Sequence, residues 1–201
     1  KIPFDYVANR GLYATPIILE VISYLRLLDN FHDSDALYRI LTREPFAIPH
    51  GDLVALAAYA KKKTIPLYDA LTQTEALSKI SEPARALVKK FLAALTEHAA
   101  YARQHTAVET YVKIVHDLGI EERVSHPALA QDAQYLATFY RTITQFEVAQ
   151  EDKRMHEFLA YLNLELESGE EGRLPTNTDE GPDTVKIITV HSAKGLEWRY
   201  V

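Results

Sequence analysis

The chain has 201 residues and a formal net charge of −6, with 47% hydrophobic and 25% charged residues, a mixture typical of a soluble globular protein. No segment approaches the roughly 20 consecutive apolar residues that a membrane helix needs, and no signal peptide opens the sequence. Cysteine is absent, which excludes disulfides and thiolate zinc sites and fits a reducing, cytoplasmic location. The acidic balance excludes a polycation, so any contact with nucleic acid has to be local.

A short strand is expected at the start of the chain, followed by a long helical region. Residues 2–7 (IPFDYV) have the composition of a strand cut from a larger sheet. Behind them, apolar residues recur at helical spacing, and this pattern predicts about eight helices. Their expected caps or first residues are Thr15, Asp33 or Ser34, Asp52, Pro66, Ser81, Thr106, Ser125 and Met155. We therefore expect a mainly α fold, a bundle-like helical region with short β-strands at both ends.

Several helix ends carry specific signals. Thr15 followed by Pro16 is a cap with proline at the first helical position. Pro45 is expected to end the second helix. Thr106 and Glu109 have the spacing of a capping box, and Gly119 can take the left-handed conformation that closes the helix behind them.

The helical pattern breaks at residues 168–183, which hold three glycines, two prolines and five acidic residues but only one large apolar residue, Leu174. This composition predicts a flexible linker. Beyond it, residues 185–190 are rich in β-branched residues and residues 196–200 alternate between apolar and polar, so each run predicts a strand. Since the chain offers almost no other strand, we expect both to belong to a sheet whose remaining strands lie outside this sequence.

Most polar clusters have an ordinary structural explanation. The eight histidines lack the helical spacing with a nearby carboxylate that a zinc site needs, so we interpret them as solvated or capping and expect no metal site. Lys61–Lys63 and Lys89–Lys90 could contact phosphates, but solvated helix faces are favoured. Residues 44–50 could present N–H groups to a phosphate, although a helix connector is favoured. No phosphate-binding loop of the GxxxxGK[ST] type occurs.

The loop between the two C-terminal runs is the strongest candidate site, because ligands are usually bound in loops at strand ends. Five polar side chains fall within nine residues there: Thr189, His191, Ser192, Lys194 and Glu197. Gly195 allows close approach of the backbone to a ligand. A lysine and a histidine suit a phosphate backbone, and a carboxylate suits a ribose hydroxyl. From spacing alone, an ordinary polar β-connection remains the alternative.

Residues 188–198, ITVHSAKGLEW, resemble motif V of the superfamily 1 helicases of the UvrD/Rep/PcrA type, whose pattern is close to T-[VIL]-H-x-[AS]-K-G-L-E-[FW]. Residues 2–7, 11–13 and 21–30 are more weakly similar to the entry to the accessory 2B subdomain, which is inserted in the second RecA-like domain of that family. The resemblance divides the chain into a strand of RecA-like domain 2A (1–9), the helical 2B subdomain (10–167), a flexible linker (168–183) and the return to domain 2A with motif V (184–201).

The resemblance implies an enzyme that uses ATP and Mg²⁺ to translocate 3′ to 5′ on single-stranded DNA and to unwind duplex DNA. Carried over by position, Thr189 and His191 would touch the DNA backbone, with Ser192 and Lys194 in the same DNA-binding loop. Glu197 would reach the ribose of the nucleotide, with Gly195 beside it. The 2B subdomain would contact duplex DNA or a regulatory protein, and no membrane partner is implied.

Departures from the family pattern limit what the chain itself is expected to do. Residues 46–51, FAIPHG, stand where members that grip duplex DNA often carry Gly-Ile-Gly, and Trp198 replaces the more usual Phe. The phosphate-binding loop, the acidic Mg²⁺ motif and the arginine motifs are missing from these residues, so we expect no catalytic residue, bound cofactor or ATPase activity in the isolated chain. Two alternatives stay open: the helicase subunit of an AddA/RecB-type helicase–nuclease, and a helical protein-interaction scaffold without a motor.

Overall fold

The computed structural model describes residues 4–6, 11–174 and 185–187, and this part of the chain is mainly helical, as expected. Its α-helices are α1 (Pro16–Asp29), α2 (Ser34–Leu41), α3 (His50–Lys63), α4 (Leu67–Thr72), α5 (Glu82–Ala102), α6 (Ala107–Asp117), α7 (Ile120–Val124), α8 (Ala130–Ala149) and α9 (Met155–Glu167). Three short 3₁₀ helices are η1 (Leu12–Ala14), η2 (Thr74–Ala76) and η3 (Pro127–Leu129), and the two strands are β1 (Phe4–Tyr6) and β2 (Val185–Ile187).

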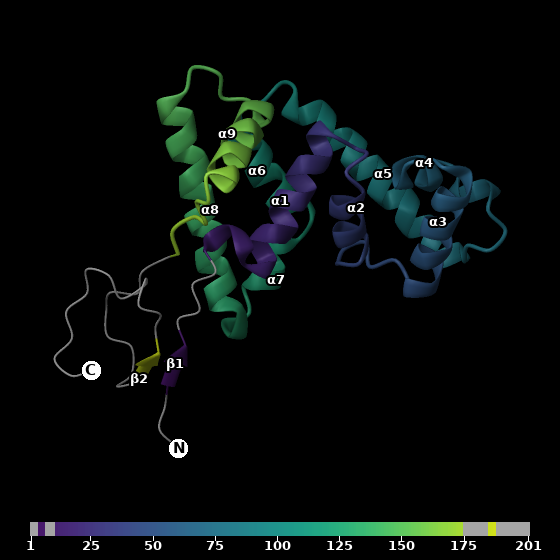
Figure 1. Cartoon of the computed structure of the whole chain (residues 1–201), viewed down its shortest axis with the longest axis horizontal. Helices are drawn as coiled ribbons and strands as arrows, with labels where there is room; N and C mark the ends of the chain where they lie inside the picture. The colour runs from purple at the N-terminus through teal and green to yellow at the C-terminus, as the bar shows by residue number, and fades with distance from the viewer. Residues whose placement is uncertain (1–3, 7–10, 175–184, 188–201) are drawn as a thin grey trace.

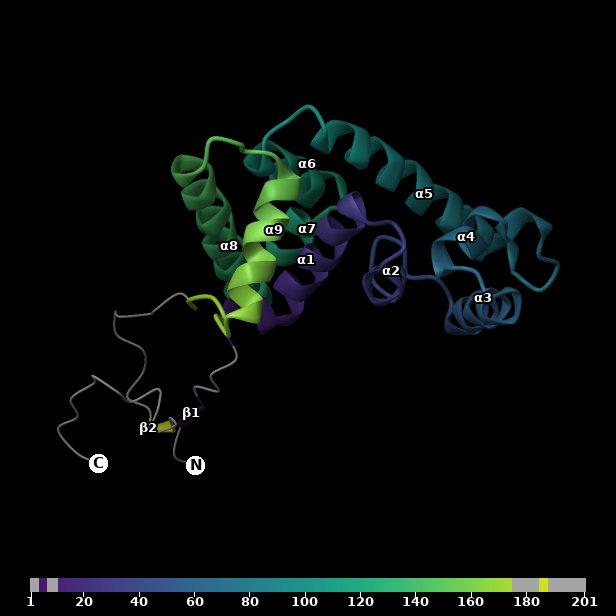
Figure 2. The same ribbon diagram turned by 45° about the horizontal axis from the view of Figure 1, so that its top comes forward.

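The helices form two lobes that are joined by α5 (Figure 1). The large lobe holds α1 and α6 to α9, and the small lobe holds α3, α4, η2 and the first half of α5. Helix α2 lies between them, and the view in Figure 2 shows the same separation from another side. A single cluster of buried apolar side chains nevertheless runs through both lobes, from Ile18 and Leu25 in α1 to Leu53 and Leu71 in the small lobe.

Local signals explain where several helices begin and end. The side chain of Asp33 accepts a hydrogen bond from the Ala36 amide, and Ser81 caps α5 in the same way. Thr106 and Glu109 form the expected capping box. Gly119 takes the left-handed conformation directly after α6, with φ of 63°.

Buried apolar stripes hold the helices together. In α1, Ile18 and Leu25 are fully buried and Val21 and Ile22 are 1–2% exposed. Burying each such side chain contributes about 1.5–3 kcal/mol relative to leaving it in water. In the large lobe the rings of Phe139, Phe146 and Phe158 meet edge to face, with Phe158 5.9 Å from Phe139 and 5.5 Å from Phe146. The core therefore follows the predicted 3.6-residue periodicity.

Several helix boundaries differ from the sequence expectation, including that of α8, which begins at Ala130 after η3 and not directly after Ser125. Helix α7 was not predicted, because it has only five residues and follows directly after Gly119, the residue expected to end a helix. Helix α3 begins at His50 rather than Asp52, and the carboxylate of Asp52 instead accepts hydrogen bonds from the amide and hydroxyl of Ser81. Helix α2 ends at Leu41, four residues before Pro45.

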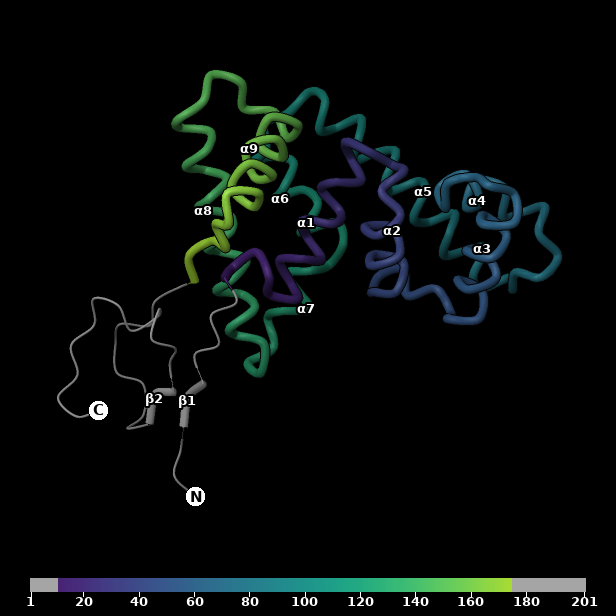
Figure 3. The backbone as a smooth tube through the Cα atoms, viewed as in Figure 1, coloured from purple at the N-terminus to yellow at the C-terminus, as the bar shows by residue number. Residues whose placement is uncertain are grey.

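The strands β1 and β2 pair in parallel although 178 residues separate them. Phe4 pairs with Val185, Asp5 with Lys186 and Tyr6 with Ile187. Neighbouring parallel strands require a crossover connection, and here the connection contains the whole helical body. Figure 3 shows that this body begins and ends side by side.

Candidate functional site

The six residues predicted to bind DNA and nucleotide, Thr189, His191, Ser192, Lys194, Gly195 and Glu197, lie outside the described residues. The strand that precedes them, β2, is described and ends at Ile187. The structure therefore leaves the predicted binding loop as a prediction. It does describe residues 11–13 and 168–174, the segments at which the helical body begins and ends.

The beginning and the end of the helical body meet at a neck formed by residues 11–13 and 171–172. The amides of Leu12 and Tyr13 donate to the carbonyls of Gly172 and Glu171 at 3.2 and 3.1 Å, and the Gly11 amide donates to the Glu171 carboxylate at 3.1 Å. A Cβ at Gly11 would lie 2.0 Å from the Glu171 carbonyl oxygen, so only glycine fits at this close approach. Residues 168–174, the described part of the expected linker, thus contact η1.

A carboxylate shared by two tyrosines supports the neck from the side of α9. The Tyr13 hydroxyl donates to Glu165 Oε2 at 2.6 Å, and the Tyr161 hydroxyl donates to the other oxygen of the same carboxylate. The hydrogen bond to Glu165 and partial burial raise the pKa of Tyr161 to about 12. Burial and the same carboxylate raise the pKa of Tyr13 well above its ordinary value. Both phenols therefore remain protonated donors at neutral pH.

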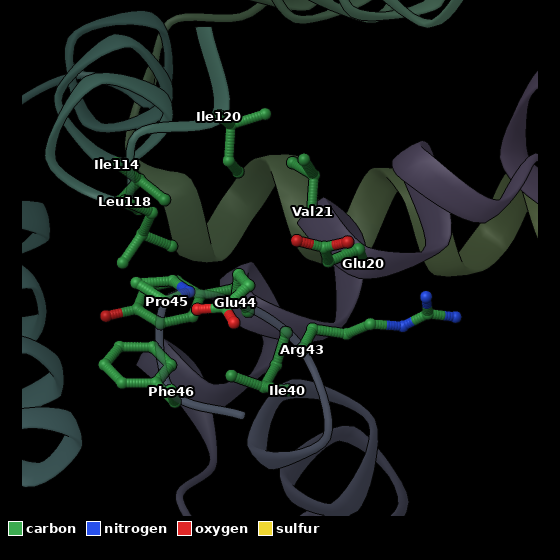
Figure 4. A pocket seen from close by; sticks show the side chains of 11 residues that line it. Glu20, Val21, Ile40, Arg43, Glu44, Pro45, Phe46, Ile114, Leu118 and Ile120 are labelled. Atoms are coloured by element: carbon green, nitrogen blue, oxygen red, sulfur yellow. The ribbon is translucent and has the colours of Figure 1, made fainter. Parts of the chain in front are cut away.

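The turn between α2 and α3 is held against the large lobe. Arg123 of α7 donates to the carbonyl of Glu44 at 3.2 Å and to the carboxylate of Glu20 at 2.5 Å. Figure 4 shows Pro45 and Phe46 of the turn beside Ile114 and Leu118, which line a small cavity. Its volume is about 10 Å³, room for about one water molecule. The cavity is thus a packing defect and not a ligand site.

Ala47 in this turn adopts a positive φ of 30°, an uncommon conformation for a residue with a Cβ. Its amide donates to the Arg43 carbonyl at 2.7 Å, and the next amide, that of Ile48, donates to the Leu41 carbonyl at 2.8 Å. These two amides are therefore occupied within the turn. They are not available to bind a phosphate, which agrees with the connector interpretation.

A buried polar network joins α1, α5 and α6. His98 is 2% exposed, with Nδ1 2.8 Å from the Tyr24 hydroxyl and Nε2 3.1 Å from Asp117 Oδ2. Lys113 donates to Asp117 at 2.6 Å and lies 2.9 Å from Glu97. The hydrogen bond from Lys113, followed by those from His116 and His98, holds the pKa of Asp117 well below its usual range.

An ionised Asp117 can only accept hydrogen bonds, so the geometry assigns the proton of His98 to Nε2. Nδ1 then accepts the Tyr24 hydroxyl proton. Burial, together with the negative charges of Asp117 and Glu97, raises the pKa of Tyr24, which keeps that proton in place. The interpretation of every histidine as solvated or capping is therefore wrong for His98, whereas His126 does cap a helix by accepting from the Ala128 amide.

The described residues contain no group of three or more His, Cys, Asp or Glu side chains that could hold a metal ion. Of the helices in the same part of the chain, none is both long and apolar enough to cross a membrane.

Comparison with known proteins gives a match along the whole sequence. The profile of the UvrD-like helicase C-terminal domain family matches residues 1–201. The chain is 24% identical over 204 residues to an ATP-dependent helicase/nuclease subunit of Lacticaseibacillus casei and over 201 residues to the subunit of the same name from Bacillus licheniformis. It is also 24% identical over 208 residues to DNA helicase II of Escherichia coli.

All of the chain is covered in these alignments, but it spans only 16% of the length of the two helicase/nuclease subunits and 28% of DNA helicase II. The relatives at 24% identity carry two different names, so identity alone does not separate the two kinds of helicase. The match to the family includes every residue of the sequence. The chain therefore belongs to the UvrD-like helicase C-terminal domain family.

Proposed function

We propose that the chain is part of the second RecA-like domain of an ATP-dependent 3′–5′ DNA helicase of the UvrD type. In this proposal residues 10–167 are the accessory 2B subdomain, 168–183 the linker, and 1–9 and 184–201 the flanking parts of the RecA-like domain. The remainder of the motor, which binds ATP and Mg²⁺, belongs to the parent protein. The 201 residues contain no phosphate-binding loop sequence, so the isolated chain does not hydrolyse ATP.

The observation that carries the proposal is the parallel pairing of β1 with β2 around a helical body that closes on itself. Phe4 to Tyr6 pair with Val185 to Ile187, and the amides of Leu12 and Tyr13 bond to residues 172 and 171. An insert whose two ends lie together can interrupt a host sheet without separating its strands. This arrangement supports an insertion between neighbouring strands of a parallel α/β sheet.

The proposed binding loop follows β2, at the carboxyl end of a parallel strand, where α/β sheets bind their ligands. Within it, the DNA backbone is contacted by Thr189, His191, Ser192 and Lys194. Glu197, with Gly195 beside it, contacts the ribose of the nucleotide. A loop with both ligands couples the state of the nucleotide to the grip on DNA, and that coupling is what translocation requires.

A second candidate is the helicase subunit of a helicase–nuclease, favoured by the similarity to the two helicase/nuclease subunits. A nuclease domain in the parent reading frame after Val201 distinguishes this candidate from a UvrD-type enzyme. A scaffold without a motor is the third candidate. It requires a parent frame without a phosphate-binding loop.

The direct test uses the full-length protein and the variant Glu197→Ala, with Glu170→Ala as the matched control, because Glu170 is an exposed carboxylate outside the proposed loop. We expect Glu197→Ala to lose most DNA-stimulated ATPase and duplex unwinding, since the ribose contact is removed, while Glu170→Ala retains both. In His191→Ala we expect basal ATPase to persist and its stimulation by single-stranded DNA to fall.

Full ATPase and unwinding activity in both Glu197→Ala and His191→Ala would contradict the assignment of these two residues to nucleotide and DNA binding. A wild-type protein without DNA-stimulated ATPase would overturn the helicase proposal itself and favour the scaffold.

A further inference from the structure

The outward face of α6 carries an open hollow with a volume of about 500 Å³, which we call the α6 hollow. Its apolar part is formed by Tyr101 at the end of α5 and by Val108 and Val112 of α6. Val112 is 44% exposed, and covering an apolar side chain of this kind is favourable because it removes apolar surface from water. The α6 hollow therefore has an apolar floor that the described residues leave open.

The charges that surround this floor leave an acidic rim. The two basic side chains of the hollow, Lys113 and His116, both bond to Asp117, at 2.6 and 3.1 Å. Glu109 and Glu121 also line the hollow, and within the described part of the chain neither has an ion-pair partner. The hollow thus offers two carboxylates without a cation and no base without a carboxylate in its described lining.

The lobe that holds the hollow is acidic as a whole, whereas the other lobe is basic. Residues 11–32 and 96–174, which include the large lobe, carry eight Lys or Arg and sixteen Asp or Glu, a formal charge of −8. Residues 50–95, which form the small lobe, carry seven Lys or Arg and four Asp or Glu, a formal charge of +3. The large lobe therefore repels a polyanion and attracts a cationic protein surface.

Helix α3 of the small lobe presents a surface of the complementary kind. Four of its residues have the spacing i, i+4, i+7 and i+8 and so lie on one face, which we call the α3 face: Val54, Ala58, Lys61 and Lys62. All four are exposed, and Val54 is 49% exposed. Within the described residues neither lysine has an ion-pair partner. The α3 face thus combines apolar side chains with positive charge that is not neutralised.

The α3 face and the α6 hollow do not meet within one chain. Helix α3 lies beside the start of α5, and α6 follows the end of α5, so the two surfaces lie at opposite ends of this helix (Figure 2). Helix α5 has 21 residues, and a helix of that length spans about 30 Å. The α3 face of one molecule is therefore available to the α6 hollow of another.

We propose that the chain associates head to tail with a second copy of itself, the α3 face of one copy lying in the α6 hollow of the next. In this contact the apolar residues of the α3 face cover Val112, and its lysines approach the carboxylates of Glu109 and Glu121. The two copies use different surfaces, so the interface is heterologous and has no two-fold axis. The proposal goes beyond the helicase assignment and does not depend on it.

The test is sedimentation velocity on the full-length protein, without DNA, at low and at high salt. One variant, Lys61→Gln with Lys62→Gln, removes the charge of the α3 face and keeps the α6 hollow. The other variant, Val112→Lys with Glu121→Lys, blocks the hollow and keeps the α3 face.

Each variant has a control that makes the same change in net charge at exposed positions outside the two surfaces. Lys89→Gln with Lys90→Gln is the control for the α3 face, since both lysines are exposed on α5. Val148→Lys with Glu151→Lys is the control for the hollow, because Val148 is 84% exposed and Glu151 is exposed as well. These controls separate the proposed contact from a general attraction between the lobes.

We expect wild-type protein to associate with a dissociation constant of about 10–100 µM at low salt, since one helix face in one hollow is a small interface, and to associate more weakly at high salt. Each blocking variant is expected to associate at least about fivefold more weakly, and each control to stay within about twofold of wild type. An equimolar mixture of the two blocking variants is expected to form a dimer that grows no further, because the mixture retains one intact α3 face and one intact hollow per pair.

Equal weakening in a variant and its control would show that only overall charge matters and would overturn the proposal. Wild-type association in the hollow variant would point to a symmetric contact elsewhere and would overturn it too. A mixture of the blocking variants that stays monomeric, or wild-type protein that stays monomeric up to about 1 mM, would also contradict the head-to-tail contact. Recovery of the dimer in the mixture shows at the same time that both variants are folded.

Discussion

The hydroxyl of Tyr24 in α1 lies 2.8 Å from Nδ1 of His98 in α5, and both side chains are almost completely buried. Helix α5 is the element that joins the two lobes, so this hydrogen bond attaches it to the large lobe. The opposite ring nitrogen of His98 bonds to Asp117 at the end of α6. Three helices are thus connected through one imidazole ring.

Tyr24→Phe is expected to destabilise the protein by about 1–2 kcal/mol, because Nδ1 of a buried histidine then has no hydrogen-bond donor. Chemical denaturation followed by circular dichroism measures the change. Tyr140→Phe is the matched control, since Tyr140 is 40% exposed and should change stability by less than about 0.5 kcal/mol. Equal stability of the two variants would show that the Tyr24 hydrogen bond contributes nothing.

Asp117→Asn is expected to lower stability at neutral pH by about 1 kcal/mol, discounted for a carboxylate that is 30% exposed. The pKa of Asp117 is depressed in the folded protein, chiefly by Lys113. The contribution of ionised Asp117 to the free energy of unfolding is therefore complete above the ordinary carboxylate pKa of about 4. This contribution is lost as the pH falls below that value. Wild type and variant should converge in acid unfolding curves. A constant difference between pH 7 and pH 2 would argue against the ion pairs.

Substitutions at the neck should disturb the hydrogen bonds between residues 11–13 and 171–172. Gly11→Ala places a Cβ 2.0 Å from the Glu171 carbonyl oxygen. In Gly172→Ala, the alanine must adopt the positive φ of 73° that Gly172 has, and its Cβ lies 3.0 Å from the Tyr13 ring. Each is expected to cost about 1–3 kcal/mol. Hydrogen exchange at the Leu12 and Tyr13 amides should accelerate in both variants.

The control for the neck is Gly51→Ala, where a Cβ meets nothing within 4 Å. Because Gly51 lies in α3, this change is expected to be neutral or to stabilise by up to about 1 kcal/mol. Similar behaviour of all three alanine variants would contradict the close approach at the neck.

Thr110→Val is expected to stabilise the protein by about 1 kcal/mol. Thr110 is fully buried in α6, and among the described residues its hydroxyl has no hydrogen-bond partner, so valine removes an uncompensated polar group at nearly constant volume. Thr74→Val provides the contrast, because the Thr74 hydroxyl donates to the Leu71 carbonyl at 2.6 Å. Thr74→Val should therefore destabilise, and a shift of the same sign in both variants would contradict this account.

Features that depend on neighbours in the chain were predictable from the sequence. The capping box of Thr106 and Glu109 needs two side chains three residues apart, and the left-handed Gly119 needs only the absence of a Cβ. The apolar stripe of α1 follows from helical periodicity. Helix α7 was missed because five residues are too few to show a period.

Features that depend on distant residues were not predictable. Tyr24 and His98 are 74 positions apart, and Gly11 and Glu171 are 160 apart, so no local pattern identifies either pair. The lysines at 61–63 and 89–90 were visible as short basic runs. That Lys89 lines a groove together with Leu71 of α4 required the fold. The residues proposed to bind DNA and nucleotide lie outside the described part of the chain and stay a prediction.

The neck has a mechanical consequence for the parent protein. Starting from either strand, the chain reaches residues 11–13 or 171–172 before it reaches any described α-helix, and these segments are bonded to each other. Once the pairing of β1 with β2 is broken, a pull between the two strands is borne by two backbone hydrogen bonds of the neck before it reaches the described helices. The helical body can therefore stay folded while the sheet that it interrupts is under tension. Forced extension should open the neck before it unfolds a helix.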